Sequence, residues 1–259
     1  MPTINLLTWN LGKRDAALAA LVKHVASLSR GAQHFVAAVQ ESTEDNAAIR
    51  ARVHQHGAAV HVVGNGGMTV LCSAPLDPIA IPRDAVGHRL LLTRATFAGQ
   101  RMAIVNYHGM ARGQRGSPDE TERGGIASEA RWRIDEHAAG DSVIVLGDFN
   151  IEQDRSEIWS RHCFSLAADP DPQSRKSHNR DRQDLRAALP RLPPGIGGTY
   201  RLQSGSRGTA WVTLDFLAGG PGLALQTEAL GKLEGIPLTD GSKPTLSDHL
   251  PVAGTLDLP

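Results

Sequence analysis

Polar residues of a few kinds follow or interrupt short apolar runs at widely separated points of the chain. The set contains carboxylates, amides and imidazoles: Asn10, Glu41, His108, Asp148, Asn150, Asp215, Asp248 and His249. The oxygens of Glu41, Asp148 and Asp248 are hard ligands that suit Mg²⁺ or Mn²⁺, which usually keeps several of its waters. These residue types favour a half-open divalent-metal site with room for phosphate oxygens.

Each of these residue types also occurs for purely structural reasons, in turns or at solvated strand ends. At any single position the structural explanation is the stronger one. Asp215 is harder to explain in this way because it lies inside the apolar run 212–217. An unpaired carboxylate there would cost several kcal/mol of desolvation. We therefore expect Asp215 to have a partner, and a histidine is a natural one.

The elements that would position these residues are read from apolar periodicity. Strands are expected at residues 4–9, 34–39, 68–72, 90–97, 102–107, 142–146, 211–217 and 251–256, and helices at 15–28, 127–138 and 181–189. The short turn 98–100 implies antiparallel pairing of the two strands that flank it. The pattern predicts an α/β (α+β) fold in which packed sheets have helices outside. Strand ends are rigid, so polar residues placed there can converge on one site.

Length and composition exclude several classes of protein. The 259 residues, 41% of them hydrophobic, suit a single domain over residues 1–259. Lys plus Arg and Asp plus Glu both number 27, so no bulk positive charge attracts nucleic acid. Two cysteines are too few for a disulfide framework. With no signal-peptide pattern and no apolar stretch of roughly 18 residues, we expect a cytoplasmic protein without stable membrane insertion, and leaderless export stays open.

Six short pieces of sequence carry these polar residues beside the expected strands. In chain order they are Thr8-Trp9-Asn10, Val39-Gln40-Glu41, Val105-Asn106-Tyr107-His108, Leu146-Gly147-Asp148-Phe149-Asn150, Thr213-Leu214-Asp215-Phe216-Leu217 and Ser247-Asp248-His249-Leu250-Pro251-Val252. Taken together, they resemble the endonuclease/exonuclease/phosphatase superfamily. Any one piece is a weak signal, whereas six in order are specific. The resemblance implies a deoxyribonuclease-I-like, four-layered sandwich of two packed mixed β-sheets flanked by helices.

The resemblance also implies a metal site and a base. Glu41, helped by Asn10, would hold Mg²⁺ or Mn²⁺, with Asp248 nearby as a ligand or as an acceptor behind the ligands. Asp148 would deprotonate or orient the attacking water. The amide of Asn150 would fix that water or a phosphate oxygen.

The remaining roles that the resemblance implies concern the phosphate. Asp215 would orient His249, as a carboxylate fixes an imidazole in other triads. His249 would then donate to a phosphoryl oxygen as charge builds on it. His108 would contact the same phosphate or protonate the leaving oxygen. Family members often pair such a histidine with a carboxylate from a neighbouring strand, yet residues 88–97 contain no acid. A phosphate contact therefore suits His108 better than general acid catalysis.

The substrate is not determined by fold and metal site. A nuclease acting on DNA is the first hypothesis, because Arg112 and Arg115 follow His108 and residues 175–191 hold six basic against two acidic side chains. A solvated polar loop explains that stretch equally well. A sphingomyelinase-like lipid or small-molecule phosphoesterase is the alternative, favoured by the zero net charge. A catalytically inactive binding module is the third reading, disfavoured because every motif residue is present.

Overall fold

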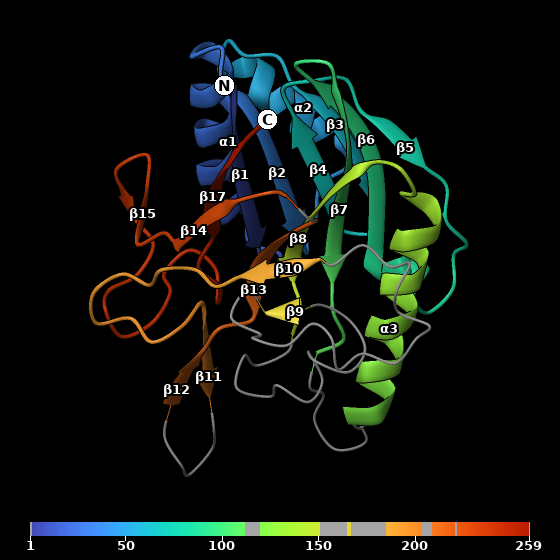
Figure 1. The fold of residues 1–259 in the computed structure, drawn as a ribbon. Helices are drawn as coiled ribbons and strands as arrows, with labels where there is room; N and C mark the ends of the chain where they lie inside the picture. Colours follow the sequence, from blue (N-terminus) through green and yellow to red (C-terminus); the bar gives the residue numbers. More distant parts are fainter. Residues whose placement is uncertain are drawn as a thin grey trace.

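The computed structural model describes residues 2–111, 120–150, 165–166, 185–203, 209–220 and 222–258, and within them two large β-sheets lie face to face (Figure 1). The first sheet has the strand order β14 (Leu225–Ala229), β17 (Val252–Asp257), β1 (Thr3–Asn10), β2 (His34–Gln40), β4 (Met68–Cys72) and β3 (His61–Asn65). β1 and β2 are parallel, and the other neighbours pair antiparallel. Both parallel strands therefore end at the same edge of this sheet.

The second sheet repeats this arrangement. Its strand order is β5 (Asp77–Ile79), β6 (Leu90–Phe97), β7 (Gln100–His108), β8 (Ser142–Asp148), β13 (Asp215–Gly219), β10 (Arg186–Ala188) and β9 (Ser165–Leu166). The expected hairpin forms between β6 and β7, and β7 runs parallel to β8. The ends of β7 and β8 therefore also meet at one edge.

Helices cover the outer faces, so the molecule has four layers (Figure 1). α1 (Asp15–Arg30) and α2 (Asn46–Gln55) pack on the first sheet, whereas α3 (Glu120–His137) packs on the second. Along β1 the side chains alternate, because successive residues of a strand point to opposite faces. Leu7 and Trp9 belong to the cluster under α1, and Ile4 and Leu6 belong to the cluster between the sheets. Within the described residues, no helix combines the length and apolar character needed to cross a membrane.

Two expected elements are wrong in detail. The run 211–217 is not one strand but divides between β12 (Thr209–Val212), which pairs with β11 (Tyr200–Gln203), and β13. The hydroxyl of Thr199 accepts from the amides of Leu214 and Asp215 at 3.0 and 3.3 Å, where the run changes sheets. The helix expected at 181–189 is also corrected, because residues 186–188 form β10, paired with β13; residues 181–184 lie outside the described residues.

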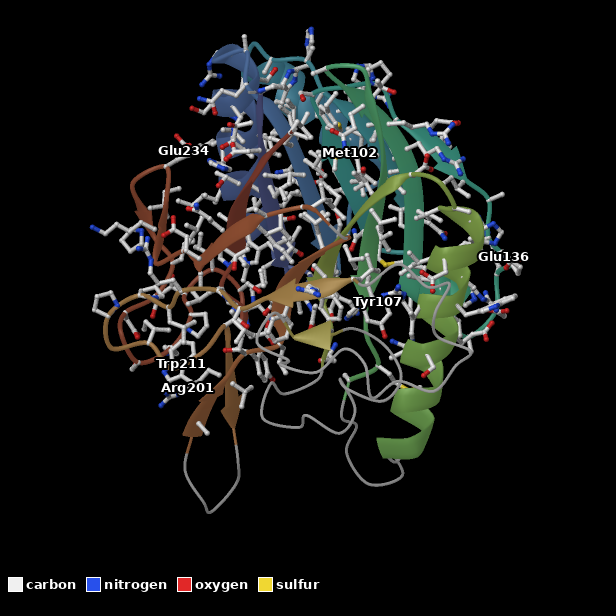
Figure 2. All side chains as sticks on the ribbon, in the orientation of Figure 1. Met102, Tyr107, Glu136, Arg201, Trp211 and Glu234 are labelled. Atoms are coloured by element: carbon white, nitrogen blue, oxygen red, sulfur yellow. The ribbon has the colours of Figure 1, made fainter. Side chains whose placement is uncertain are left out.

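Two smaller features complete the fold. A short hairpin joins β15 (Lys232–Leu233) to β16 (Ile236–Pro237), and a 3-10 helix, η1 (Gly87–Arg89), leads into β6. In Figure 2, Arg201 and Trp211 lie together on the β11–β12 hairpin, and Trp211 also packs against the apolar cluster under α1. The guanidinium carbon of Arg201 is 5.2 Å from the centre of the Trp211 ring.

Candidate active site

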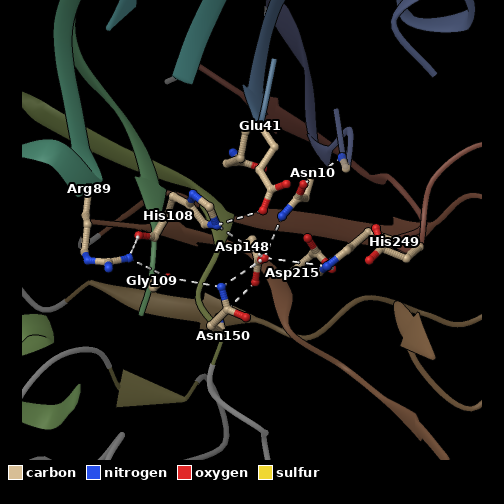
Figure 3. Close-up of polar contacts among 12 residues, drawn as sticks. Asn10, Glu41, Arg89, His108, Gly109, Asp148, Asn150, Asp215 and His249 are labelled. Atoms are coloured by element: carbon tan, nitrogen blue, oxygen red, sulfur yellow. Dashed lines mark hydrogen bonds and ion pairs between the residues drawn. The ribbon is translucent and has the colours of Figure 1, made fainter. Parts of the chain in front are cut away.

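The polar residues at the strand ends converge where the edges of the two sheets meet (Figure 3). β1 ends at Asn10, β7 at His108 and β8 at Asp148, while β13 begins at Asp215. The strand register places both His108 and Asp215 directly opposite Asp148. Glu41 follows β2 by one residue. Sheet pairing therefore brings together residues that lie far apart in the sequence.

Asp148 is the centre of the hydrogen-bond network. Its carboxylate accepts from Asn10 Nδ2 at 3.0 Å, from the backbone N–H of Asn150 at 2.9 Å and from Asn150 Nδ2 at 3.1 Å. The side chain is 1% exposed. Burial raises the pKa of Asp148 above its usual value, as does Asp215, against the opposing effect of His249. Asp148 therefore binds a proton more readily than an ordinary aspartate does.

Asp215 and His249 form a buried pair. Nδ1 of His249 lies 2.9 Å from Oδ2 of Asp215, and its Nε2 lies 3.7 Å from Oδ2 of Asp148. Burial disfavours the imidazolium most strongly, yet Asp215 and Asp148 outweigh it and raise the pKa of His249. The histidine is thus held as a cation, with Nδ1 donating to Asp215 and Nε2 aimed at Asp148.

Glu41 and His108 approach each other from different sheets. His108 Nε2 lies 3.8 Å from Glu41 Oε1 and 3.9 Å from Asp148 Oδ2, and the Glu41 side chain is 34% exposed. Burial lowers the pKa of His108, although Glu41 opposes this effect. Residues 88–97 supply no carboxylate, as expected, but the fold brings two from β8 and from the end of β2. Neutral His108 can accept or donate one hydrogen bond in the site.

The backbone of Glu41 adopts an uncommon conformation. Its φ is +54°, in the left-handed region that non-glycine residues rarely occupy. Its carbonyl accepts from the N–H of Lys13 at 3.1 Å, and the next residue, Ser42, donates from its N–H to the carbonyl of Gly67 at 2.9 Å. Such strain persists only where surrounding structure enforces it, and it is common at functional sites. Turns from β1 and from the β3–β4 hairpin thus fix the direction of Glu41.

Asp248 lies at the rim of the site. Its side chain is exposed, and Oδ1 accepts from the Ser247 hydroxyl at 3.3 Å. A Cβ at Gly12 would lie 2.7 Å from this oxygen, and the φ of Gly12 is +56°. Gly12 therefore leaves the space that Asp248 occupies. The Gly12 N–H donates to Asn10 Oδ1 at 3.0 Å, which ties the same turn to the site.

Asn150 turns back toward the site. Its Nδ2 donates to the carbonyl of Gly109 at 3.1 Å as well as to Asp148, and its φ is +53°. Asn tolerates this region better than most residues. Arg112 lies outside the described residues, as do Arg115 and most of the basic stretch 175–191.

Two kinds of metal donor set are present. The buried group Asp148, Asp215 and His249 has ligand atoms within 4.8 Å of one another. Within the described residues, Asp215 Oδ2 bonds to His249 Nδ1 and Asp148 bonds to Asn10 and Asn150, whereas Asp215 Oδ1 has no hydrogen-bond partner. Glu41 offers a partly exposed carboxylate beside them. The hard oxygens at this end fit Mg²⁺ or Mn²⁺.

Two further residues belong to the site although the sequence did not single them out. Tyr200 places its ring 4.6 Å from that of His249, at a tilt of 40°, and Thr199 holds the amide of Asp215. Burial raises the pKa of Tyr200, and Asp248, Asp148 and Glu41 add to the effect. Thr199 precedes the short hairpin strand β11 and Tyr200 is its first residue, and neither lies in a stretch of apolar periodicity. Nothing local in the sequence marked them.

Comparisons with known proteins identify the family and the fold of the chain. The family model described as "Endonuclease/Exonuclease/phosphatase family" matches residues 7–249. No curated protein matches in sequence. The solved structures that are similar include truncated TDP2 from Caenorhabditis elegans, 16% identical with a TM-score of 0.62, covering 99% of this chain and 98% of that one.

Two other structures show the same fold. A family protein from Bacteroides thetaiotaomicron is 15% identical with a TM-score of 0.59 and 99% of both chains covered. A beta toxin mutant from Staphylococcus aureus with bound magnesium ions is 13% identical with a TM-score of 0.59, covering 96% of this chain and 98% of that one. The expected deoxyribonuclease-I-like, four-layered fold is confirmed. The chain belongs to the endonuclease/exonuclease/phosphatase family, and hence to a family of hydrolases.

Proposed function

We propose that this protein hydrolyses phosphodiester bonds of DNA with Mg²⁺ or Mn²⁺. The observation that carries the proposal is the buried Asp148, which lies between the Asp215–His249 pair and the partly exposed Glu41. A phosphodiester repels nucleophiles, so its hydrolysis needs cationic and N–H groups on one side and a base on the other. The site holds both kinds of group.

Glu41, Asn10 and Asp248 would hold the metal. The side-chain oxygen of Asn10, Oδ1, accepts one hydrogen bond, from the N–H of Gly12. An amide oxygen has a second lone pair, which is available for a bond to the metal. When bound, the ion supplies positive charge to the phosphate oxygens. Magnesium ions in the Staphylococcus aureus beta toxin structure support this choice of metal.

Asp148 would act on water and His249 on the phosphate. The raised pKa of Asp148 makes it a better proton acceptor than an ordinary aspartate. With Nδ1 bonded to Asp215, the charged His249 can donate from Nε2 to a phosphoryl oxygen and stabilise the charge that develops there. Asp215 keeps the imidazole charged and oriented.

The remaining residues would complete phosphate binding. His108, with a lowered pKa, would donate one hydrogen bond to the phosphate as a neutral imidazole. Asn150 would hold Asp148 and, through its amide, the water or a phosphate oxygen. Arg112 would contact phosphates farther along the strand. The basic stretch 175–191 favours DNA in the same way.

A lipid or small-molecule phosphodiester or phosphomonoester is the second candidate substrate. The zero net charge and the absence of a long basic stripe in the sequence favour it. The same metal site and the same Asp148 would serve this reaction, so only the groups around the phosphate would differ.

The test is a panel of plasmid DNA, single-stranded DNA, RNA, sphingomyelin and phosphomonoesters, each with Mg²⁺, Mn²⁺ or chelator. We expect metal-dependent cleavage of plasmid, lost in Asp148→Asn, a variant that removes the base at nearly constant volume. Intact plasmid together with release of phosphocholine or inorganic phosphate would favour the second candidate. No turnover of any substrate with either metal would contradict both.

A further inference from the structure

A buried pair of amide side chains joins the two sheets below the site. Gln40 is the last residue of β2 in the first sheet, and Asn106 lies in β7 of the second; both are 0% exposed. Gln40 Nε2 donates to Asn106 Oδ1 at 2.7 Å. Asn106 Nδ2 donates back across the interface to the carbonyls of Val39 and Thr69, at 2.9 and 3.0 Å. Three hydrogen bonds therefore cross between the sheets at one point.

The direction of each amide follows from its partners. Backbone carbonyls only accept hydrogen bonds, so the NH₂ group of Asn106 must face Val39 and Thr69. Its oxygen then faces Gln40, which must present its own NH₂ group. The second hydrogen of that group points to the hydroxyl of Thr8, 3.2 Å away. This leaves Gln40 Oε1 buried with no hydrogen-bond partner in the described part of the chain, which lowers stability.

Most of the remaining sheet interface is apolar, and the hydrogen bond from Asn10 to Asp148 crosses it at the site itself. Its cluster includes Ile4, Leu6 and Val36 from the first sheet and Ile104 and Ile144 from the second. Apolar contacts are non-directional, and such cores tolerate small shifts of one layer against another. Hydrogen bonds require particular distances and angles. Away from the Asn10–Asp148 contact in the site, the amide pair is thus a directional contact that can fix the position of one sheet relative to the other.

The position of the pair connects it to the site. Gln40 immediately precedes Glu41, and Asn106 lies two residues before His108. Asn10 and Glu41 come from the first sheet, whereas His108 and Asp148 come from the second. The two halves of the site must keep their separation for the reaction to proceed, and the amide pair is placed to control it.

We propose that Gln40 and Asn106 are positioning residues, whose inter-sheet hydrogen bonds hold the Glu41 half of the site against the His108–Asp148 half. The inference rests on the proposed phosphoesterase function. It explains why a polar pair with an unpaired oxygen is present in a largely apolar interface. The pair touches neither substrate nor metal and acts through the strands that carry Glu41 and His108.

The test compares Gln40→Met with Thr8→Val. Thr8→Val removes only the hydrogen bond of the Gln40 amide that lies within the first sheet, whereas Gln40→Met removes that bond and also the one that crosses to Asn106. We expect Gln40→Met to lower kcat about 10- to 100-fold with KM within about twofold, since small misplacements of reacting groups have effects of this size. Thr8→Val should keep kcat within about twofold. Equal losses in both variants, or none in Gln40→Met, would overturn the proposal.

Mn²⁺ binding gives a readout that does not depend on turnover. Asn10, Glu41 and Asp248 all belong to the first sheet or the turns at its end, so calorimetry should give the same Mn²⁺ affinity for Gln40→Met and the parent. A large loss of affinity would show that Gln40 acts on Glu41 alone and would overturn the inter-sheet role. If Gln40→Met fails to fold, Gln40→Asn, which is too short to reach Asn106, replaces it.

Crystal structures separate this inference from the proposed function. The distance from His108 Nε2 to Glu41 Oε1, 3.8 Å in the parent, should lengthen in Gln40→Met and stay constant in Thr8→Val. An unchanged distance in Gln40→Met overturns the positioning role. A parent that cleaves no phosphoester while the distance still changes would contradict the proposed function and leave the inter-sheet role supported.

Discussion

Asp215 holds His249 by a hydrogen bond of 2.9 Å in a place where both side chains are shielded from water. The second nitrogen of the imidazole points to Asp148, so one histidine lies between two buried carboxylates. The two carboxylates flank the imidazolium and stabilise its positive charge, and the three groups together carry one net negative charge when all are ionised. The positive charge of His249 therefore depends on its contacts with Asp215 and Asp148.

Replacing Asp215 by Asn should remove most of the activity. The substitution keeps the shape but removes the charge that raises the pKa of His249. Loss of the orienting carboxylate in a triad costs about 10⁴-fold in kcat. We expect a loss of about 10³- to 10⁴-fold in steady-state assays, together with a lower His249 pKa by NMR. An unchanged imidazole titration in the variant would contradict this account.

Asp148 should titrate well above an ordinary aspartate. Burial raises its folded-state pKa above that of an exposed aspartate, so the folded protein binds a proton at a pH where the unfolded chain does not. By linkage, this group favours the folded state at low pH, and the effect is lost as the pH rises through the folded pKa. Activity needs the ionised form and should fall as the pH falls through the same range.

Carboxyl-labelled ¹³C NMR of the metal-free protein measures this titration directly. The Asn10 hydrogen bond lowers the pKa of Asp148 against the effect of burial, so Asn10→Leu should raise it further. A normal aspartate titration in the parent would show that Asp148 is more hydrated than its 1% exposure indicates.

Glu41→Gln should weaken metal binding. The substitution removes the negative charge from the proposed ligand while keeping its size, so the Kd for Mn²⁺ should rise at least about tenfold by calorimetry. Activity at limiting metal should fall and partly recover in excess metal. Glu234→Gln is the matched control, because Glu234 lies on the β15–β16 turn and pairs with His24 (Figure 2). If Glu41→Gln and Glu234→Gln bind Mn²⁺ with equal affinity, Glu41 is not a ligand of the metal.

Cys72 should be chemically inert in the folded protein. Burial raises the pKa of its thiol to about 12, so almost no thiolate forms at neutral pH. In a Cys163→Ser variant, Cys72 is the remaining cysteine. A thiol reagent such as DTNB should modify it only after denaturant is added. Rapid modification of the native variant would mean that β4 opens readily.

Asp141 should contribute far more to stability than a surface ion pair does. Its side chain is 0% exposed and accepts from Arg94 Nε at 2.6 Å and from Arg101. Asp141→Ala should lower the free energy of unfolding by about 1–3 kcal/mol, because these charged hydrogen bonds are lost. Glu228→Ala removes an exposed ion pair with Arg191 and should change the free energy of unfolding by less than about 1 kcal/mol. Urea unfolding of both variants measures the difference, and similar values would contradict it.

Many of the strands could be predicted because the pattern of apolar residues that forms each of them lies within the strand itself. Short apolar runs predicted β1, β2, β4, β6, β7 and β8, because the side chains that bury each of these strands are its own. The division of 211–217 between two sheets was not predictable. The same apolar run suits one long strand or two short ones, and the hydrogen bonds of Thr199 decide between them. Residues 186–188 became a strand because β13 offered an edge for pairing.

By itself, the sequence determined which residues stand at strand ends and that Asp215 needed a partner, because burial of a charge has a known cost wherever it occurs. Only the tertiary structure decided which atoms meet. It brought Glu41 beside His108, turned Asn150 toward Asp148 and Gly109, and joined Gln40 to Asn106. These contacts cross between strands or between sheets, so their geometry depends on how the layers pack and has no local signal in the chain.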